Sequence, residues 1–156
     1  MRRGGGVQVR ELRSGDEGAV RQLRGELDRV HAALMPDYFR VPGEPVVPPR
    51  DSDAQILVAE GEGGVCGFVV VRAVETPRDP SMTPRRRAHV EMVVVGEGAR
   101  RQGVGTRLMT EAERWASLRG CAEVVLTVWS DNRAAEALYG ALGYEPIARV
   151  LRRSIS

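Results

Sequence analysis

A glycine-rich loop between a predicted strand and a predicted helix is the segment best suited to chemistry. It follows an apolar run that ends at Val95, and it consists of Arg100, Arg101, Gln102, Gly103, Val104, Gly105 and Thr106. The amides of a helix's first turn lack partners within the helix, the helix dipole adds partial positive charge there, and glycines let a pyrophosphate approach the backbone. Arginines add fixed charge that suits phosphate oxygens. The loop therefore predicts a site for a phosphate-bearing ligand.

The two glycines of this loop have a second explanation, because Gly103 and Gly105 would also ease a tight turn from strand to helix. Two nucleotide-binding motifs are excluded. The Gly-x-Gly-x-x-Gly fingerprint of dinucleotide sites is absent after the strand, and the Gly-Lys-Ser/Thr ending of a P-loop needs a lysine, which this sequence lacks. The phosphate-bearing ligand must therefore be of another kind.

Residues further along the chain complete a pattern that resembles the GNAT superfamily of N-acetyltransferases. The family's Arg/Gln-x-x-Gly-x-Gly/Ala pattern falls on Arg100, Gly103 and Gly105. Its later pattern of Asn, Ala, Tyr, Gly and Phe/Tyr falls, at the right separation, on Asn132, Ala135, Tyr139, Gly143 and Tyr144. The resemblance covers about residues 7–151, with the specific motifs between residues 90 and 144.

The resemblance implies that acetyl-CoA is the co-substrate, without a metal. Its pantetheine arm would lie in a gap beside the strand and bond like an extra strand to Val93, Val94 and Val95. Its pyrophosphate would lie on the glycine-rich loop. Backbone N–H groups near Met92 or Val93 would stabilise the oxyanion that forms when an amine attacks the thioester.

Two side chains of the later motif receive roles from the same resemblance. Asn132 would bond to the pantetheine arm, and Tyr139 would act as the general acid for the departing thiolate. By itself, a tyrosine at helical spacing is also explained by packing. The motif around Tyr139 favours the catalytic role.

An ammonium group must lose a proton before it can attack, so the site needs a base or a water path to solvent. Glu91 is the first candidate, because an acid among the apolar residues Val90, Met92 and Val93 would have a raised pKa if it were partly buried. The alternative is that strand alternation turns Glu91 toward solvent or an arginine. His31 and His89 are secondary candidates.

The acceptor pocket of the superfamily is built largely by the first helices and the loop that follows them. Residues 35–39 resemble a stretch of many members that act on small molecules, so we expect Tyr38 and Phe39 to bind the acceptor. Exposed core residues or a dimer contact would explain the same aromatic residues.

Hydrophobic periodicity predicts the elements that position these residues. A helix with a core stripe of Val20, Leu23, Leu27, Val30 and Leu34 is ended by Pro36. Two further helices span residues 103–118 and 133–142, and strands are expected at residues 7–12, 55–60, 65–74, 88–95, 123–129 and 144–151. The fold class is therefore a mixed α/β (α+β) sheet in the order β-α-β-β-β-α-β-α-β. The resemblance implies a GNAT-like fold, with a splayed parallel strand pair around the cofactor.

The composition excludes several classes of protein. We expect one domain over residues 1–156, with a flexible N-terminus at residues 1–6, no membrane span and no secretory signal, hence a cytoplasmic location. The two cysteines have no metal-ligand spacing. The net charge is only +2, so the arginine run at residues 85–87 is better explained as a solvated loop than as a nucleic-acid site.

The sequence thus predicts an acyltransferase of class EC 2.3.1.-, an N-acetyltransferase. It would transfer an acetyl group from acetyl-CoA to an amine of a small molecule or peptide by direct attack in a ternary complex. Homodimers are common among similar proteins, so a homodimer is the expected assembly. The alternative function is a regulatory domain that binds acyl-CoA without catalysis.

Overall fold

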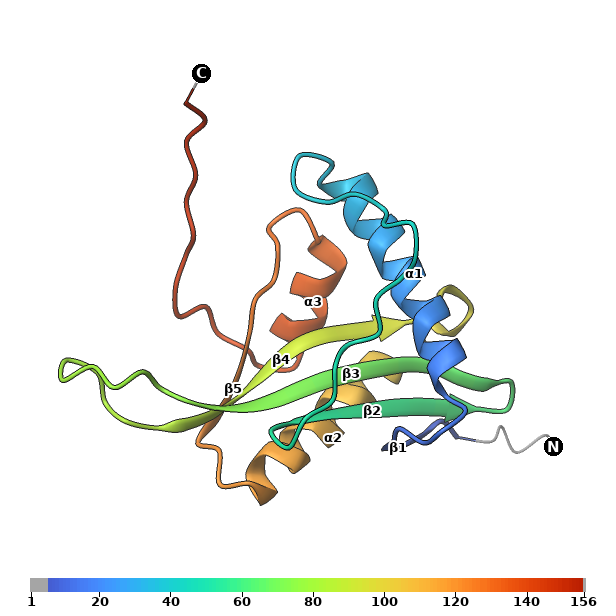
Figure 1. The fold of residues 1–156 in the computed structure, drawn as a ribbon, viewed down its shortest axis with the longest axis horizontal. Coiled ribbons are helices and arrows are strands. Elements are labelled where there is room, and N and C mark those ends of the chain that lie inside the picture. Colours follow the sequence, from blue (N-terminus) through green and yellow to red (C-terminus); the bar gives the residue numbers. More distant parts are fainter. Residues whose placement is uncertain (1–5, 156) are drawn as a thin grey trace.

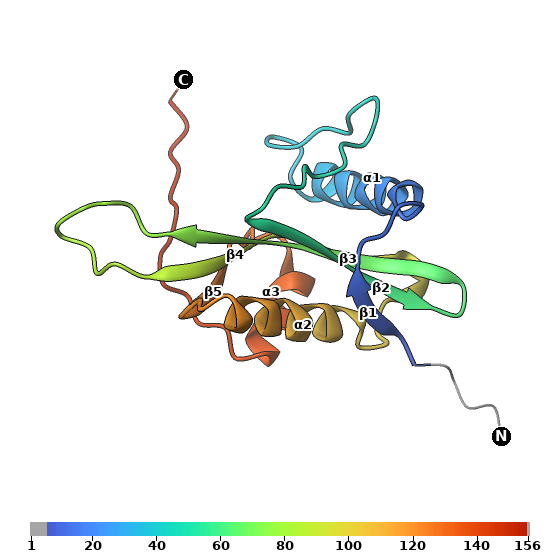
Figure 2. The same ribbon diagram turned by 60° about the horizontal axis from the view of Figure 1, so that its bottom comes forward.

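The computed structural model of the protein describes residues 6–155, which form one mixed sheet with helices on both faces (Figure 2). The sheet holds five strands in chain order: β1 (Gln8–Glu11), β2 (Ala54–Gly61), β3 (Gly64–Glu75), β4 (Arg86–Val95) and β5 (Glu123–Leu126). The first four pair antiparallel, and β4 pairs with β5 in parallel. A parallel pair needs a crossover, which here runs through a helix. The predicted mixed sheet with one parallel pair is confirmed.

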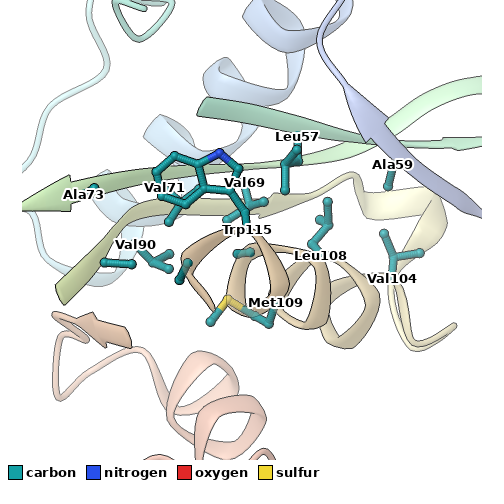
Figure 3. Packing of buried hydrophobic residues seen from close by; sticks show 13 residues of the cluster. Leu57, Ala59, Val69, Val71, Ala73, Val90, Val104, Leu108, Met109 and Trp115 are labelled. Carbon is teal, nitrogen blue, oxygen red and sulfur yellow. The ribbon is translucent and has the colours of Figure 1, made fainter. Parts of the chain in front are cut away.

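The helices lie on opposite faces of the sheet. α1 (Glu17–Leu34) covers one face, while α2 (Val104–Leu118) and α3 (Arg133–Ala141) lie on the other, and a short 3-10 turn, η1 (Glu97–Ala99), joins β4 to α2 (Figure 1). Val104, Leu108 and Trp115 of α2 point toward the strands (Figure 3). Fully buried side chains of this kind each stabilise the fold by roughly 1.5–3 kcal/mol. The two hydrophobic layers hold β4 from both sides.

The first half of α1 packs as its periodicity predicts, but its second half does not. Val20 and Leu23 are buried against the sheet, whereas Leu34 is 42% exposed. Asp28 is instead the buried residue of the second half. The core stripe predicted to reach Leu34 is therefore wrong at its end, because this part of the helix projects beyond the strands.

The prediction of a strand at residues 144–151 is wrong, because the described part of the chain has no strand after α3. After α3 the chain runs extended beside the sheet without joining it (Figure 1). Ile147, Val150 and Leu151 are 74%, 96% and 89% exposed. A pattern typical of a strand shows that a segment can join a sheet, but it does not place an open sheet edge beside that segment. The predicted order is confirmed as far as the third helix.

The N-terminal segment predicted to be flexible, residues 1–6, lies outside the described residues except for Gly6. Within residues 6–155, no helix is both long and apolar enough to cross a membrane.

Candidate active site

β4 and β5 separate where the sequence predicts the cofactor. The two strands pair only between residues 87–90 and residues 123–126. Within the described chain, residues 91–95 of β4 therefore have no partner on the β5 side. Glu91 is an extra residue in β4, because Val70 of β3 faces Met92 while Val71 faces Val90. Such a bulge bends a strand and re-aims its backbone groups. The carbonyl oxygen of Val95 accepts a hydrogen bond from Nε of Arg100 at 3.3 Å, and the backbone groups on this edge before Val95 are left for a ligand.

The glycine-rich loop ends at an open helix terminus. Gly103 is the N-cap of α2 and has φ of 76°, a left-handed conformation that glycine adopts without strain. No side chain caps the first turn of α2, so its amides remain available. Arg101 also has a positive φ of 62°, although it is not a glycine. Strained backbone of this kind concentrates at functional sites.

Gly105 permits α3 to pack against the start of α2. A Cβ at position 105 would lie 3.1 Å from Cδ2 of Leu138. Gly103 therefore serves the turn, as the structural explanation expects, whereas Gly105 serves close packing against Leu138. The same packing brings α3, through Leu138, against the first turn of α2.

Asn132 is the N-cap of α3. Its Oδ1 accepts a hydrogen bond from the backbone N–H of Ala135 at 3.2 Å, as expected for a capping asparagine. The cap uses the side-chain oxygen. The side-chain NH₂ is left to donate to another group.

Tyr139 and Tyr144 are neighbours with different hydroxyl partners. Their rings meet edge to face at 5.9 Å. The hydroxyl of Tyr144 donates to Oε1 of Glu113 at 2.8 Å, whereas no described residue bonds to the hydroxyl of Tyr139. Burial raises the pKa of Tyr139, so its phenol stays protonated at neutral pH. Tyr139 thus has a proton available for donation, and that of Tyr144 is held by Glu113.

Glu91 faces an arginine rather than a buried pocket. Nε of Arg72 donates to Oε1 of Glu91 at 2.7 Å, and Nη1 of the same arginine donates to Asp51 at 2.7 Å. The Glu91 side chain is 34% exposed. This is the alternative that strand alternation left open. The role of Glu91 as the base stays a prediction.

Tyr38 and Phe39 belong to a chain of aromatic rings that starts on α1. The ring of His31 lies 4.7 Å from that of Phe39. Phe39 lies 5.2 Å from Trp129, and Trp129 lies 5.0 Å from Tyr38. Trp129 follows β5, so these rings connect α1 to the far side of the gap. Tyr38 is 50% exposed, and the guanidinium carbon of Arg152 lies 4.9 Å from the centre of its ring, so Arg152 shares this aromatic surface with any ligand.

A hollow of ≈ 470 Å³ opens beside the same loop. It is lined by the start of α1, the turn between β2 and β3, residues 96–99 and Gln102. Neither Asn132 nor Tyr139 lines it. The hollow therefore lies apart from the gap between β4 and β5.

The family assignment follows from comparison with known proteins. The Acetyltransferase (GNAT) family matches residues 27–144, which include β4, the glycine-rich loop, Asn132 and Tyr139. The chain belongs to this family. An aminoglycoside N(6')-acetyltransferase type 1 from Serratia marcescens is 34% identical over 64 residues, which are 41% of this chain and 44% of that enzyme. The match thus spans less than half of that relative.

Solved structures share the GNAT fold over nearly the whole chain. A mutant of the BH1408 protein from Bacillus halodurans has a TM-score of 0.89 at 22% identity, covering 96% of this chain and 99% of that one. The aminoglycoside N-acetyltransferase AAC(6')-Iy in complex with CoA has a TM-score of 0.74 at 20% identity, covering 99% and 98%. At such identities the likeness establishes the fold alone.

The arginine run of this GNAT chain is engaged in ion pairs. Arg85 and Arg87 pair with Glu123 at 3.4 and 3.2 Å, and Arg86 pairs with Glu75 at 2.8 Å. Arg86 and Arg87 also lie within β4 rather than in the predicted loop. Each arginine of the run therefore has a carboxylate partner within the described chain.

Two residues beside the GNAT site gave no signal in the sequence. Trp129 was expected to lie within a strand, and Asp28 was hidden between the apolar residues of the α1 stripe. Only the structure shows that Trp129 contacts Phe39. Only the structure shows that Asp28 is buried, with 8% of the residue exposed.

Proposed function

We propose that this chain is an N-acetyltransferase that transfers the acetyl group of acetyl-CoA to an amine by direct attack in a ternary complex. The observation that carries the proposal is the unpaired edge at residues 91–95, which ends at a helix terminus with uncapped amides. An unpaired strand edge suits the amide groups of pantetheine. Free amides and Arg101 suit its pyrophosphate. The CoA held by the AAC(6')-Iy structure supports the same choice.

The reaction needs three contributions from the chain: stabilisation of the oxyanion, a general acid for the thiolate, and a route for the proton of the amine. The amine nitrogen attacks the thioester carbon, and N–H groups near Met92 or Val93 stabilise the oxyanion. The C–N bond forms, the C–S bond breaks, and the thiolate takes the proton of Tyr139. The proton that the amine loses passes to Glu91 or along water to solvent, and Tyr139 is reprotonated from solvent. The products are an amide and free CoA.

The proposed base of the reaction is Glu91. Glu91 lies at the bulge, next to Met92, which favours it by position. Its pairing with Arg72 occupies one carboxylate oxygen. We keep Glu91 as the proposed base, with the other oxygen accepting the proton.

The acceptor would lie against Tyr38 and Phe39. The matching aminoglycoside enzyme supports an amine acceptor. Tyr38 and Trp129 supply apolar surface next to the gap. A small-molecule amine therefore fits this face.

A turnover assay tests the proposal against the non-catalytic alternative. Release of CoA from acetyl-CoA is followed with a thiol reagent across amines, aminoglycosides, amino acids and peptides, and acetyl-CoA binding is measured by calorimetry. We expect amine-dependent release of CoA. Tight binding without release for any amine would favour a regulatory acyl-CoA-binding domain, and no binding would exclude both.

A homodimer is proposed from the exposed segment after α3. β5 is an edge strand, and an open edge invites another strand. Within the described residues, each copy has one open β5 edge and one extended segment with exposed Ile147, Val150 and Leu151. The segment of one copy can therefore pair with the β5 edge of the other, and the reverse, around a two-fold axis. Light scattering after gel filtration is expected to give twice the chain mass. Leu151→Asp should then yield the monomer, with Ser154→Asp as the control.

A further inference from the structure

Asp28 is the one charged or polar residue that is buried within residues 6–155. Its side chain is only 10% exposed. Oδ1 accepts a hydrogen bond from Nε of Arg24 at 2.9 Å. Oδ2 is buried and has no hydrogen-bond partner in the described chain. Half of the carboxylate is therefore satisfied within the protein and half is not.

An unpaired carboxylate oxygen in a protein interior opposes folding, because it loses water without gaining a donor. An apolar residue at the same helical position would extend the core stripe of α1 without this penalty. Groups of this kind are exceptions that call for a functional explanation. The orphaned oxygen of Asp28 is such an exception.

Asp28 lies close to the strand that carries the reaction. Nη1 of Arg24, the partner of Asp28, contacts Sδ of Met92 at 3.3 Å. Met92 directly follows the bulge residue Glu91 on β4. Oδ2 is buried, so a ligand reaches it only after side chains around it change rotamer. Arg24 and Met92 have long, flexible side chains that can do so.

The aromatic chain extends from the same helix face. His31 lies three residues, or about one turn, beyond Asp28, and its ring contacts Phe39 at 4.7 Å. Phe39 continues through Trp129 to Tyr38. The carboxylate of Asp28 and the first ring of the aromatic chain thus lie about one helical turn apart on α1.

We propose that Asp28 binds the ammonium group of the acceptor, and that the acceptor is a small primary amine with one ammonium group and an apolar ring. This inference rests on the proposed function. Carboxylates and aromatic faces together recognise organic ammonium ions. Arg24 occupies one oxygen of Asp28, so the other takes a single ammonium group. The rings of Phe39, Trp129 and Tyr38 take the apolar body.

Asp28 acts in binding and not in the chemical step. The ammonium donates a hydrogen bond to Oδ2 while it is still protonated, and little water screens the pair at this depth. The proton then leaves by the route given above, and the neutral amine attacks the thioester. Removal of Asp28 should therefore change acceptor affinity and leave acetyl-CoA affinity unchanged.

The test compares Asp28→Asn with Glu17→Gln. Both changes remove one carboxylate from α1, but the Glu17 side chain is 60% exposed. Phenethylamine is the probe with one ammonium and a ring, and spermidine and kanamycin are the polycationic probes. In Asp28→Asn we expect the KM for phenethylamine to rise about tenfold or more. The KM for acetyl-CoA should stay within about twofold, and Glu17→Gln should match the wild type.

Calorimetry of phenethylamine binding to the CoA-loaded chain separates this inference from the proposed function. Binding to the wild type that is lost in folded Asp28→Asn supports the inference even without turnover. An unchanged affinity in folded Asp28→Asn overturns it. Preference of the wild type for spermidine or kanamycin over phenethylamine overturns the substrate class.

Trp129→Leu keeps the inference testable if Asp28→Asn does not fold. Trp129 is 37% exposed and lies on a different element. The change removes the ring but keeps apolar bulk. It should raise the KM for phenethylamine several-fold and leave the KM for propylamine, which has no ring, unchanged. Equal effects on both amines would contradict the role of the aromatic rings.

Discussion

Gly105 and Leu138 lie so close that a Cβ on residue 105 would be 3.1 Å from Cδ2 of Leu138. This contact joins the first turn of α2 to α3. It therefore connects the first turn of α2, at the end of the glycine-rich loop, to the helix that carries Tyr139. A methyl group at position 105 would require the side chain of Leu138 to shift by a few tenths of an ångström.

Gly105→Ala should disturb this contact. The added methyl overpacks the helix junction, so we expect the free energy of unfolding to fall by about 1–3 kcal/mol and the KM for acetyl-CoA to rise. Chemical denaturation and steady-state kinetics measure the two effects. Gly98→Ala is the control, because a Cβ there meets nothing within 4 Å. Equal behaviour of the two variants would show that the contact does not matter.

Tyr139→Phe should lower kcat by about a hundredfold, because a general acid typically contributes that much or more. The affinity for acetyl-CoA should remain, since the ring is kept. Tyr144→Phe is the control, because it removes the hydroxyl of the neighbouring tyrosine in the same way. It loses the hydrogen bond to Glu113, so we expect about 1 kcal/mol of lost stability with kcat nearly unchanged. Full turnover by Tyr139→Phe at saturating acceptor would remove Tyr139 from the mechanism.

Glu91→Gln tests the proposed base through the pH dependence of kcat/KM. If Glu91 accepts the proton of the amine, the acidic limb of the profile should disappear in this variant. Glu75→Gln is the control, because Glu75 pairs with Arg86 at 2.8 Å on the neighbouring strand. An acidic limb that survives in Glu91→Gln would assign the proton to water or another group.

His31 should make stability depend on pH. Burial, followed by the charge of Arg24, lowers the pKa of His31 below its ordinary value of 6.5, although Asp28 opposes the shift. Between the lowered pKa of the folded state and 6.5, the unfolded chain binds more protons at His31 than the folded chain does. The contribution of neutral His31 to the free energy of unfolding is therefore fully present above pH 6.5, and it decreases as the pH falls from 6.5 to the pKa of the folded state. Urea unfolding of wild type and His31→Gln at several pH values measures this.

The comparison at pH 8 serves as the reference, because His31 is neutral there in both states. Below pH 6.5 the wild type should lose stability relative to His31→Gln. Parallel stability curves for the two proteins at all pH values would contradict the assignment.

Local patterns in the sequence determined the features that depend on neighbours along the chain. The periodicity of α2 predicted a face that does lie in the core, at Val104, Leu108 and Trp115. The spacing of Arg100, Gly103 and Gly105 marked the turn before that helix, and Asn132 was expected among the caps of α3. Helix periodicity, caps and turns arise from contacts a few residues apart, so the sequence displays them directly.

The tertiary structure alone decided which distant residues meet. It placed Trp129 against Phe39, turned Glu91 toward Arg72 and left Asp28 buried with one unpaired oxygen. It also left residues 144–151 outside the sheet, although the sequence predicted a strand there. Strand pairing and burial depend on partners far away in the chain, and a segment's own residues do not encode whether such a partner edge is within reach.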